Sequence, residues 1–155
     1  MTNFSELLIQ KNIKISTAES CTGGLLAKTF TDVPGSSKFF DSGFVTYSNQ
    51  SKTKILQVSP ELIKKHGAVS SIIAEEMAIG ALNNSAANFS IAVTGIAGPS
   101  GGSKEKPVGT VYICMRDSNN KSYTFKLQLN GNRDYIRSET VNFILKELTK
   151  LIMTI

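Results

Sequence analysis

The sequence predicts an α/β fold, a single three-layer α/β/α domain over residues 1–155 whose sheet mixes parallel and antiparallel strands. Segments with strand-like and helix-like periodicity alternate through the first part of the chain. Two strand-like segments then follow one another across a short polar turn, which is typical of an antiparallel hairpin. A length of 155 residues fits one domain, and no linker or internal repeat divides it.

The N-terminal half supplies two strands and four helices. Alternating apolar and polar residues predict a strand at 13–17, and a second strand is predicted at 43–48. Apolar spacing and capping residues predict helices at 3–11, 21–33, 49–58 and 59–67. Asn49 is expected to cap the third of these, and Ser59, Pro60 and Gly67 mark the start and end of the fourth.

The C-terminal half supplies the longest helix and the hairpin. Helices are predicted at 70–86 and 132–152, and strands at 89–95, 109–117 and 121–129. The segment at 89–95 is almost continuously apolar, which favours a strand buried on both faces. It leads into a loop at 95–109 that is dense in glycine and proline.

Composition narrows the class of protein without deciding it. The net charge of +5 is scattered, and no run of lysines exceeds two, so the sequence lacks a nucleic-acid-binding pattern while suiting an anionic small molecule. We expect no nucleic-acid partner and no membrane association, and a cytoplasmic location, because no long apolar stretch or signal peptide is present. Cys21 and Cys114 are isolated, and no cluster of side chains predicts a metal site or a cofactor.

Three loops qualify as parts of one pocket. They are 18–24, 47–52 and 94–109, and each leaves a predicted strand for a helix or a glycine-rich segment. Ligands of open α/β sheets bind beyond the carboxyl ends of the strands. We therefore expect these loops to converge.

Each loop also has a plain structural interpretation. Ser20, Cys21 and Thr22 could hold an anion or oxyanion with free N–H groups, or could simply cap a helix. Lys52 could act as a base if it is desolvated, or could be an ordinary solvated lysine. The third loop could bind phosphate through its backbone or be a surface loop. His66 lies at a predicted helix end, which disfavours a Ser-His-Asp triad and leaves a serine–lysine arrangement.

Five ordered blocks give the sequence a specific resemblance. They are TAESCTGGLLA at 17–27, GFVTYSNQSK at 43–52, HGAVS at 66–70, AIGAL at 78–82 and VTGIAGPSGGSKEKPVGTVY at 93–112, with a weaker trace in NGNRDYIR at 130–137. With these blocks the chain resembles the CinA C-terminal domain family and, within it, the stand-alone nicotinamide-nucleotide amidohydrolases. Ser100 and Lys104 depart from residues common in that family.

The resemblance implies an activity and three catalytic residues. It implies metal-independent hydrolysis of the carboxamide of nicotinamide mononucleotide, with release of ammonia, in pyridine nucleotide recycling. It assigns the nucleophile to Ser20 and its partners to Tyr47 and Lys52. It also implies a homo-oligomer, a dimer or higher.

Substrate contacts are expected from residues beside these three. N–H groups near Cys21, Thr22 and Gly23 would hold the oxyanion. The phosphate would be bound by backbone and cationic donors, for which the candidates are Thr94, Gly95, Gly101, Gly102, Ser103, Arg133 and Arg137.

Two other functions stay open at this point. The chain could be an amidase for another small amide, which keeps the chemistry and changes the substrate. It could also be a catalytically inactive nucleotide-binding module linked to competence or the DNA-damage response.

Overall fold

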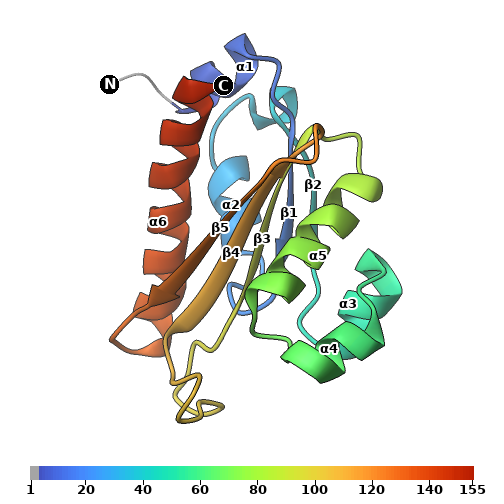
Figure 1. The fold of residues 1–155 in the computed structure, drawn as a ribbon. Helices are drawn as coiled ribbons and strands as arrows, with labels where there is room; N and C mark the ends of the chain where they lie inside the picture. The colour runs from blue at the N-terminus through green and yellow to red at the C-terminus, as the bar shows by residue number, and fades with distance from the viewer. Residues whose placement is uncertain (1–3) are drawn as a thin grey trace.

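A five-stranded sheet forms the centre of the protein, and helices cover both of its faces (Figure 1). The computed structural model describes residues 4–155; Asn3, part of the helix predicted at 3–11, lies outside them. The strands are β1 (Ile15–Glu19), β2 (Phe40–Val45), β3 (Phe89–Gly95), β4 (Thr110–Asp117) and β5 (Ser122–Gln128), in the spatial order β2-β1-β3-β4-β5. β1 runs parallel to β2 and β3, whereas β3, β4 and β5 are antiparallel. The predicted three-layer fold with a mixed sheet is confirmed.

The helices divide into two layers (Figure 1). One layer holds α1 (Phe4–Gln10), α2 (Leu25–Thr31) and α6 (Arg133–Thr154), and the other holds α3 (Asn49–Leu56), α4 (Pro60–His66) and α5 (Ser71–Asn83). A short 3₁₀ turn at Ser36–Lys38 precedes β2. The connections that leave β1 and β2 run to opposite faces of the sheet, the arrangement that opens a crevice at the carboxyl ends of parallel strands.

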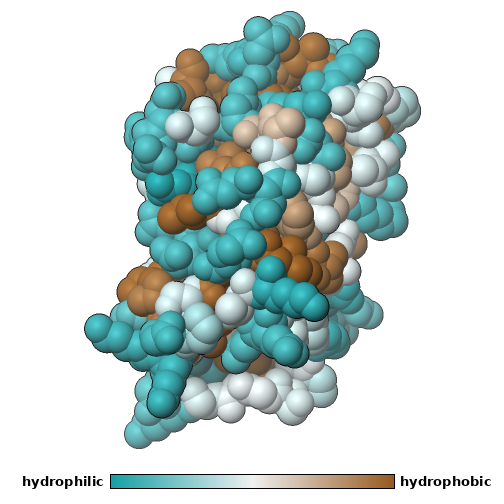
Figure 2. Space-filling view, turned by 90° about the vertical axis from the view of Figure 1, so that its right-hand side faces the viewer, coloured by the Kyte–Doolittle hydropathy of each residue, from teal (hydrophilic) through white to brown (hydrophobic). Residues whose placement is uncertain are grey.

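Two apolar clusters hold the layers together. Side chains such as Ile15, Ile91 and Ile113 pack towards α1, α2 and α6. On the opposite face, small residues such as Ala18 and Ala92 let α5 lie close to the sheet. The outer surface of the α3–α5 layer is mostly hydrophilic with separate small hydrophobic areas (Figure 2), because the apolar stripes of these helices face inwards.

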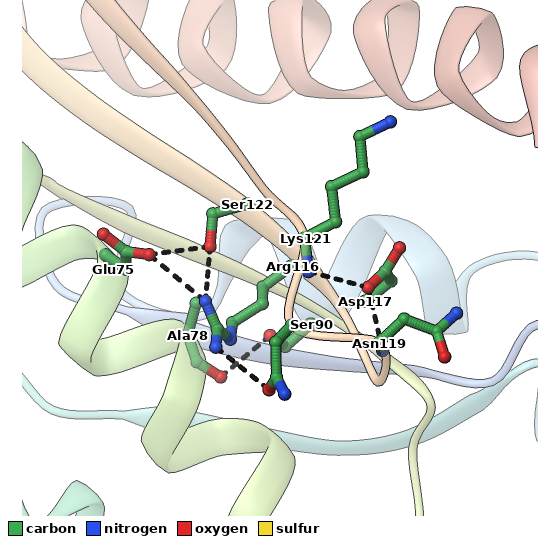
Figure 3. A network of polar contacts seen from close by, with 9 residues as sticks. Glu75, Ala78, Ser90, Arg116, Asp117, Asn119, Lys121 and Ser122 are labelled. Carbon is green, nitrogen blue, oxygen red and sulfur yellow. Dashed lines mark hydrogen bonds and ion pairs between the residues drawn. The ribbon is translucent and has the colours of Figure 1, made fainter.

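A polar network ties α5 to the β4–β5 hairpin (Figure 3). The Arg116 guanidinium donates to the Glu75 carboxylate at 3.2 Å and to Ser122 Oγ at 2.6 Å, and Ser122 Oγ donates to Glu75 at 2.8 Å. Arg116 pairs with Ser90 near the start of β3, whereas the carboxyl end of β3 is at Gly95. The network is therefore towards the other end of the sheet from the predicted pocket.

The order of elements matches the prediction, but several boundaries differ. Helix α2 begins at Leu25, not at residue 21, because Gly23 and Gly24 have φ of 58° and 99°, which an α-helix excludes. Strand β2 occupies 40–45 instead of 43–48, because its pairing with β1 already starts at Phe40. The cap of α3 is Ser48, not Asn49, since Ser48 Oγ accepts the N–H of Ser51 at 3.0 Å.

Candidate active site

A cavity of about 320 Å³ opens at the carboxyl ends of β1 and β3. The three predicted loops converge there, together with the α4–α5 connection and the start of α6. Eight of the predicted site residues line it: Ser20, Cys21, Tyr47, Lys52, Thr94, Gly95, Gly101 and Arg133. Chain segments more than 100 residues apart in the sequence thus share one pocket.

Ser20 and Lys52 form a buried pair at the floor of this cavity. Lys52 Nζ lies 3.0 Å from Ser20 Oγ, and the two residues are 1% and 8% exposed, Lys52 being the deeper. Ser20 is placed by the sheet, because its N–H donates to Val93 O at 3.0 Å and so extends the β1–β3 pairing by one residue. Lys52 points in from the first half of α3. The alternative of a solvated lysine is therefore excluded.

Within residues 4–155, Lys52 Nζ has three hydrogen-bond acceptors, and none of them is a carboxylate. It donates to Thr46 O at 2.9 Å and Tyr47 O at 3.3 Å besides Ser20 Oγ. Burial disfavours the charged ammonium and lowers the pKa of Lys52 to about 8, although the nearby Cys21 thiol acts in the opposite direction. An amine with this pKa exchanges its proton near neutral pH, as a general base must.

Cys21 is the weaker of the two adjacent nucleophiles. Its side chain belongs to the apolar cluster on the α2–α6 face, and burial raises the pKa of its thiol to about 12. A thiol reacts as its thiolate, which such an environment suppresses. The geometry therefore favours Ser20 as the attacking group.

Tyr47 and Arg133 meet at the mouth of the pocket. Tyr47 is 58% exposed, and its hydroxyl accepts a hydrogen bond from Arg133 Nη2 at 3.0 Å. Arg133 Nη1 donates to Gly98 O at 2.8 Å, which ties the start of α6 to the loop after β3. The guanidinium is thereby fixed at the pocket rim, where an anionic group of a ligand could reach it.

The remaining predicted residues lie outside the cavity lining. Gly23, Gly102 and Ser103 are exposed, the first in the turn after Ser20 and the other two in the loop after β3, and Thr22 is buried within the turn after Ser20. Arg137 donates from Nη2 to Thr22 O at 2.9 Å, so it contacts the turn and not the pocket.

Sequence reasoning does not select Asn49, Ala68 and Val69, which also line the cavity. The sequence assigns Asn49 the role of a helix cap, and so gives no reason to expect it in the cavity lining, where it lies together with Lys52. Ala68 and Val69 stand in the HGAVS block, which is the signal available for them. Ala68 O accepts a hydrogen bond from Thr94 Oγ1 at 2.9 Å, so this connection is joined directly to β3.

Residues 4–155 offer neither a metal site nor a membrane span. They hold no group of three or more His, Cys, Asp or Glu side chains placed to bind a metal ion. None of their helices combines the length and apolar character required to cross a membrane.

Comparisons with known proteins place these features in a family. The family model described as the CinA C-terminal domain matches residues 1–152. The nicotinamide-nucleotide amidohydrolase PncC of Escherichia coli K12 is 43% identical over 143 residues, which are 92% of this chain and 87% of that protein. A putative competence-damage inducible protein of Caldicellulosiruptor bescii is 48% identical over 95% of this chain. The chain spans only 36% of that longer relative.

A solved structure shares the fold closely. The competence/damage inducible protein CihA of Agrobacterium tumefaciens superposes with a TM-score of 0.89 at 44% identity, over 96% of this chain and 94% of that one. With a matching family model over nearly its whole length, the chain belongs to the CinA C-terminal domain family.

Proposed function

We propose that this protein hydrolyses the carboxamide of nicotinamide mononucleotide to nicotinate mononucleotide and ammonia, a reaction of pyridine nucleotide recycling. The observation that carries the proposal is the buried contact of 3.0 Å between Lys52 Nζ and Ser20 Oγ. The name of the PncC relatives supports the substrate. An amide is a poor electrophile, so its hydrolysis needs an activated nucleophile and a stabilised oxyanion.

The partners of Lys52 direct its lone pair. Thr46 O and Tyr47 O can only accept hydrogen bonds, so a neutral amine satisfies both with its two protons. The lone pair is then left for Ser20 Oγ, which is the only one of the three partners that has a proton to give. Lys52 takes that proton while Ser20 Oγ attacks the carboxamide carbon.

The rest of the reaction follows from the same groups. Among residues 4–155, no backbone carbonyl accepts from the N–H of Cys21 or Thr22, and these N–H groups would hold the oxyanion. Collapse of the tetrahedral intermediate breaks the C–N bond as the proton held by Lys52 passes to the departing ammonia, either directly or by way of the Tyr47 hydroxyl, and Lys52 becomes neutral again. Water, deprotonated by Lys52, then attacks the Ser20 ester, and Lys52 returns that proton to Ser20 Oγ as the carboxylate leaves.

Arg133 is the proposed cation for the substrate phosphate, assisted by backbone donors of Thr94, Gly95 and Gly101 at the pocket wall. Its guanidinium is fixed at the rim, because Nη1 donates to Gly98 O in the loop after β3 and Nη2 donates to the Tyr47 hydroxyl. Gly102 and Ser103 would contribute only if their loop turned inwards, and Arg137 is occupied at Thr22 O. We expect no metal or cofactor in this scheme.

The deciding experiment measures ammonia release from nicotinamide mononucleotide by the wild type, Ser20→Ala and Cys21→Ala. We expect the wild type and Cys21→Ala to be active and Ser20→Ala to lose at least about 10³-fold in kcat. Cys21→Ala is the matched control, since it alters the adjacent nucleophile without touching the Ser20–Lys52 contact. A folded wild type that releases no ammonia would favour another amide substrate or an inactive binding module instead.

A further inference from the structure

The Glu19 carboxylate is fully buried, and it does not face the pocket. It accepts the backbone N–H of Leu26 at 2.8 Å and of Ala27 at 3.0 Å, the second and third residues of α2. Glu19 is also the last residue of β1 and directly precedes Ser20. The turn formed by residues 20–24, called here the Ser20 turn, is thus held by Glu19 at both ends. The main chain of Glu19 leads into the turn from β1, and its carboxylate binds the first turn of the helix that follows.

This carboxylate replaces the local cap that α2 lacks. Gly24 stands at the cap position with φ of 99° and makes no side-chain capping bond. A serine or aspartate at that position would satisfy the same N–H groups, but it would not readily adopt this left-handed backbone. Because Glu19 caps the helix from the strand, the Ser20 turn is free to take a tight conformation in which Gly23 N–H donates to Ser20 O at 3.0 Å.

Arg137 holds the middle of the same turn from α6. Its Nη2 donates to Thr22 O at 2.9 Å, and this carbonyl also accepts the N–H of Leu25 at 3.1 Å. With its carbonyl held by Arg137 and its N–H on Ser20 O, the Thr22–Gly23 peptide group cannot rotate freely. It directly follows the two peptide groups whose N–H groups, those of Cys21 and Thr22, are proposed for the oxyanion.

We propose that Glu19 and Arg137 are positioning residues that fix the Ser20 turn and so aim the Ser20 hydroxyl and the neighbouring N–H groups at the reacting carbonyl. The inference rests on the proposed amidase function. Neither side chain touches the substrate in this scheme. A buried carboxylate is a costly way to cap a seven-residue helix, which indicates a role beyond stability.

The test compares Glu19→Gln and Arg137→Gln with the wild type for kcat and KM with nicotinamide mononucleotide. The glutamine introduced by Glu19→Gln is nearly isosteric, but its single oxygen leaves one of the two N–H groups without its acceptor. We expect kcat to fall about 10-fold to 100-fold in each variant, with KM within about twofold, because ground-state binding at Arg133 is untouched. The half-maximum of the pH profile should stay where the wild type has it, since the Lys52 contacts remain.

A matched control separates positioning from loss of fold. Glu75→Gln also removes a carboxylate that accepts two hydrogen bonds, but in the network of Figure 3 and away from the Ser20 turn. We expect kcat of this variant within about twofold of the wild type, even if its melting temperature falls as far as that of Glu19→Gln. If Glu19→Gln does not fold, Arg137→Gln decides, because Arg137 is only half-buried.

A second measurement distinguishes failure of this inference from failure of the proposed function. It follows the rate at which a fluorophosphonate labels Ser20, which requires an aimed serine but no amide substrate. Slower labelling of both variants supports positioning even if the wild type releases no ammonia. Wild-type kcat or wild-type labelling in the folded variants overturns the inference while leaving the amidase intact, and a wild type that is neither active nor labelled overturns both.

Discussion

At Lys52, a single nitrogen with three acceptors is held where water hardly reaches it, 1% exposed and 3.0 Å from the serine that it would deprotonate. Its pKa of about 8 means that most molecules carry the protonated amine at neutral pH. The base form is then a minor species under ordinary conditions. Its population rises about tenfold for each pH unit below the pKa.

This ionisation predicts a pH profile. We expect kcat/KM for nicotinamide mononucleotide to rise about tenfold per unit below about pH 8 and to level off above it, because only neutral Lys52 can accept the Ser20 proton. Initial rates of ammonia release between about pH 6 and 10 measure the profile. Cys21→Ala should keep the shape of this profile and move its half-maximum slightly to lower pH, because the Cys21 thiol partly offsets the lowering of the Lys52 pKa by burial. A profile that is flat across this range contradicts the assignment of the base.

The lowered pKa of Lys52 also predicts that this residue reduces the stability of the folded protein. Its pKa is about 8 in the folded protein and 10.5 in the unfolded chain, so the unfolded state binds more protons between these values. The free energy of unfolding therefore rises with pH through that window, and the penalty is full below about pH 8, at about 3 kcal/mol. Lys52→Met should be inactive yet more stable than the wild type at neutral pH by about 1–3 kcal/mol.

Urea denaturation of the wild type and Lys52→Met at about pH 7 and about pH 10 tests this effect on stability. The stabilisation by Lys52→Met should shrink at the higher pH, where the wild type has lost most of its penalty. Lys54→Met, on the exposed side of the same helix, should change neither activity nor stability by much. A Lys52→Met variant that is less stable at neutral pH would show that the three hydrogen bonds outweigh the buried charge.

The position of Lys52 depends on how closely α5 packs against α3. Gly80 of α5 faces the end of α3, and a Cβ atom there would clash with Leu56 O and lie 2.7 Å from Leu56 Cβ. Leu56 is one turn beyond Lys52 on α3, so the distance between these two helices sets where the lysine stands. The backbone of α3 cannot yield to an added methyl group on Gly80 without moving Lys52.

Gly80→Ala is therefore expected to destabilise the protein and to slow the reaction. Overpacking of this kind costs about 1–3 kcal/mol, and we expect kcat to fall at least about tenfold as Lys52 shifts from Ser20. Denaturation and ammonia release measured on one preparation would check both effects. Asn83→Ala, at the exposed end of α5, is the control and should be nearly neutral. Full activity with reduced stability would mean that α5 moves instead of α3.

Local patterns predict the elements well, because each has its own periodicity and stop signals. Ser59 caps α4 as expected, and its Oγ accepts the N–H of Leu62 at 3.4 Å. Boundaries at the site are harder, since Gly23 and Gly24 are compatible with a helix until their positive φ is known. The burial of Lys52 has no local signal at all. Its helix is polar in sequence, and only the contact with Ser20, 32 positions away, reveals its environment.

The burial of Glu19, like that of Lys52, could not be predicted from the sequence. An acidic residue at the end of a strand suggests a solvated position or a ligand, and the sequence offers no reason to place its carboxylate under a helix. Ser20, Tyr47 and Arg133 can be selected because their motifs recur in a family. A residue such as Glu19, whose proposed role is to hold the backbone, is not recognisable until its hydrogen bonds are seen.

For the molecule as a whole, the net charge of +5 favours an anionic substrate. We expect kcat/KM for nicotinamide mononucleotide to fall about threefold to tenfold when NaCl rises from about 50 to about 500 mM, as screening weakens attraction of the phosphate. Nicotinamide riboside, which lacks the phosphate, should be a poorer substrate and show no such fall. Equal salt dependence for both would exclude the phosphate as the group attracted. The homo-oligomeric state stays a prediction that analytical ultracentrifugation can examine.

The two ends of the described chain have a practical consequence. α1 and the last turns of α6 lie together at one end of the sheet (Figure 1). The pocket lies at the carboxyl ends of β1 and β3, which are at the other end. A segment that continues beyond α1 or α6 therefore starts on the side away from the pocket. The fold is thus suited to serve as one unit of a longer polypeptide, as in the relative of which it spans 36%. It can likewise be tethered to a surface by either terminus with its entrance facing the solution.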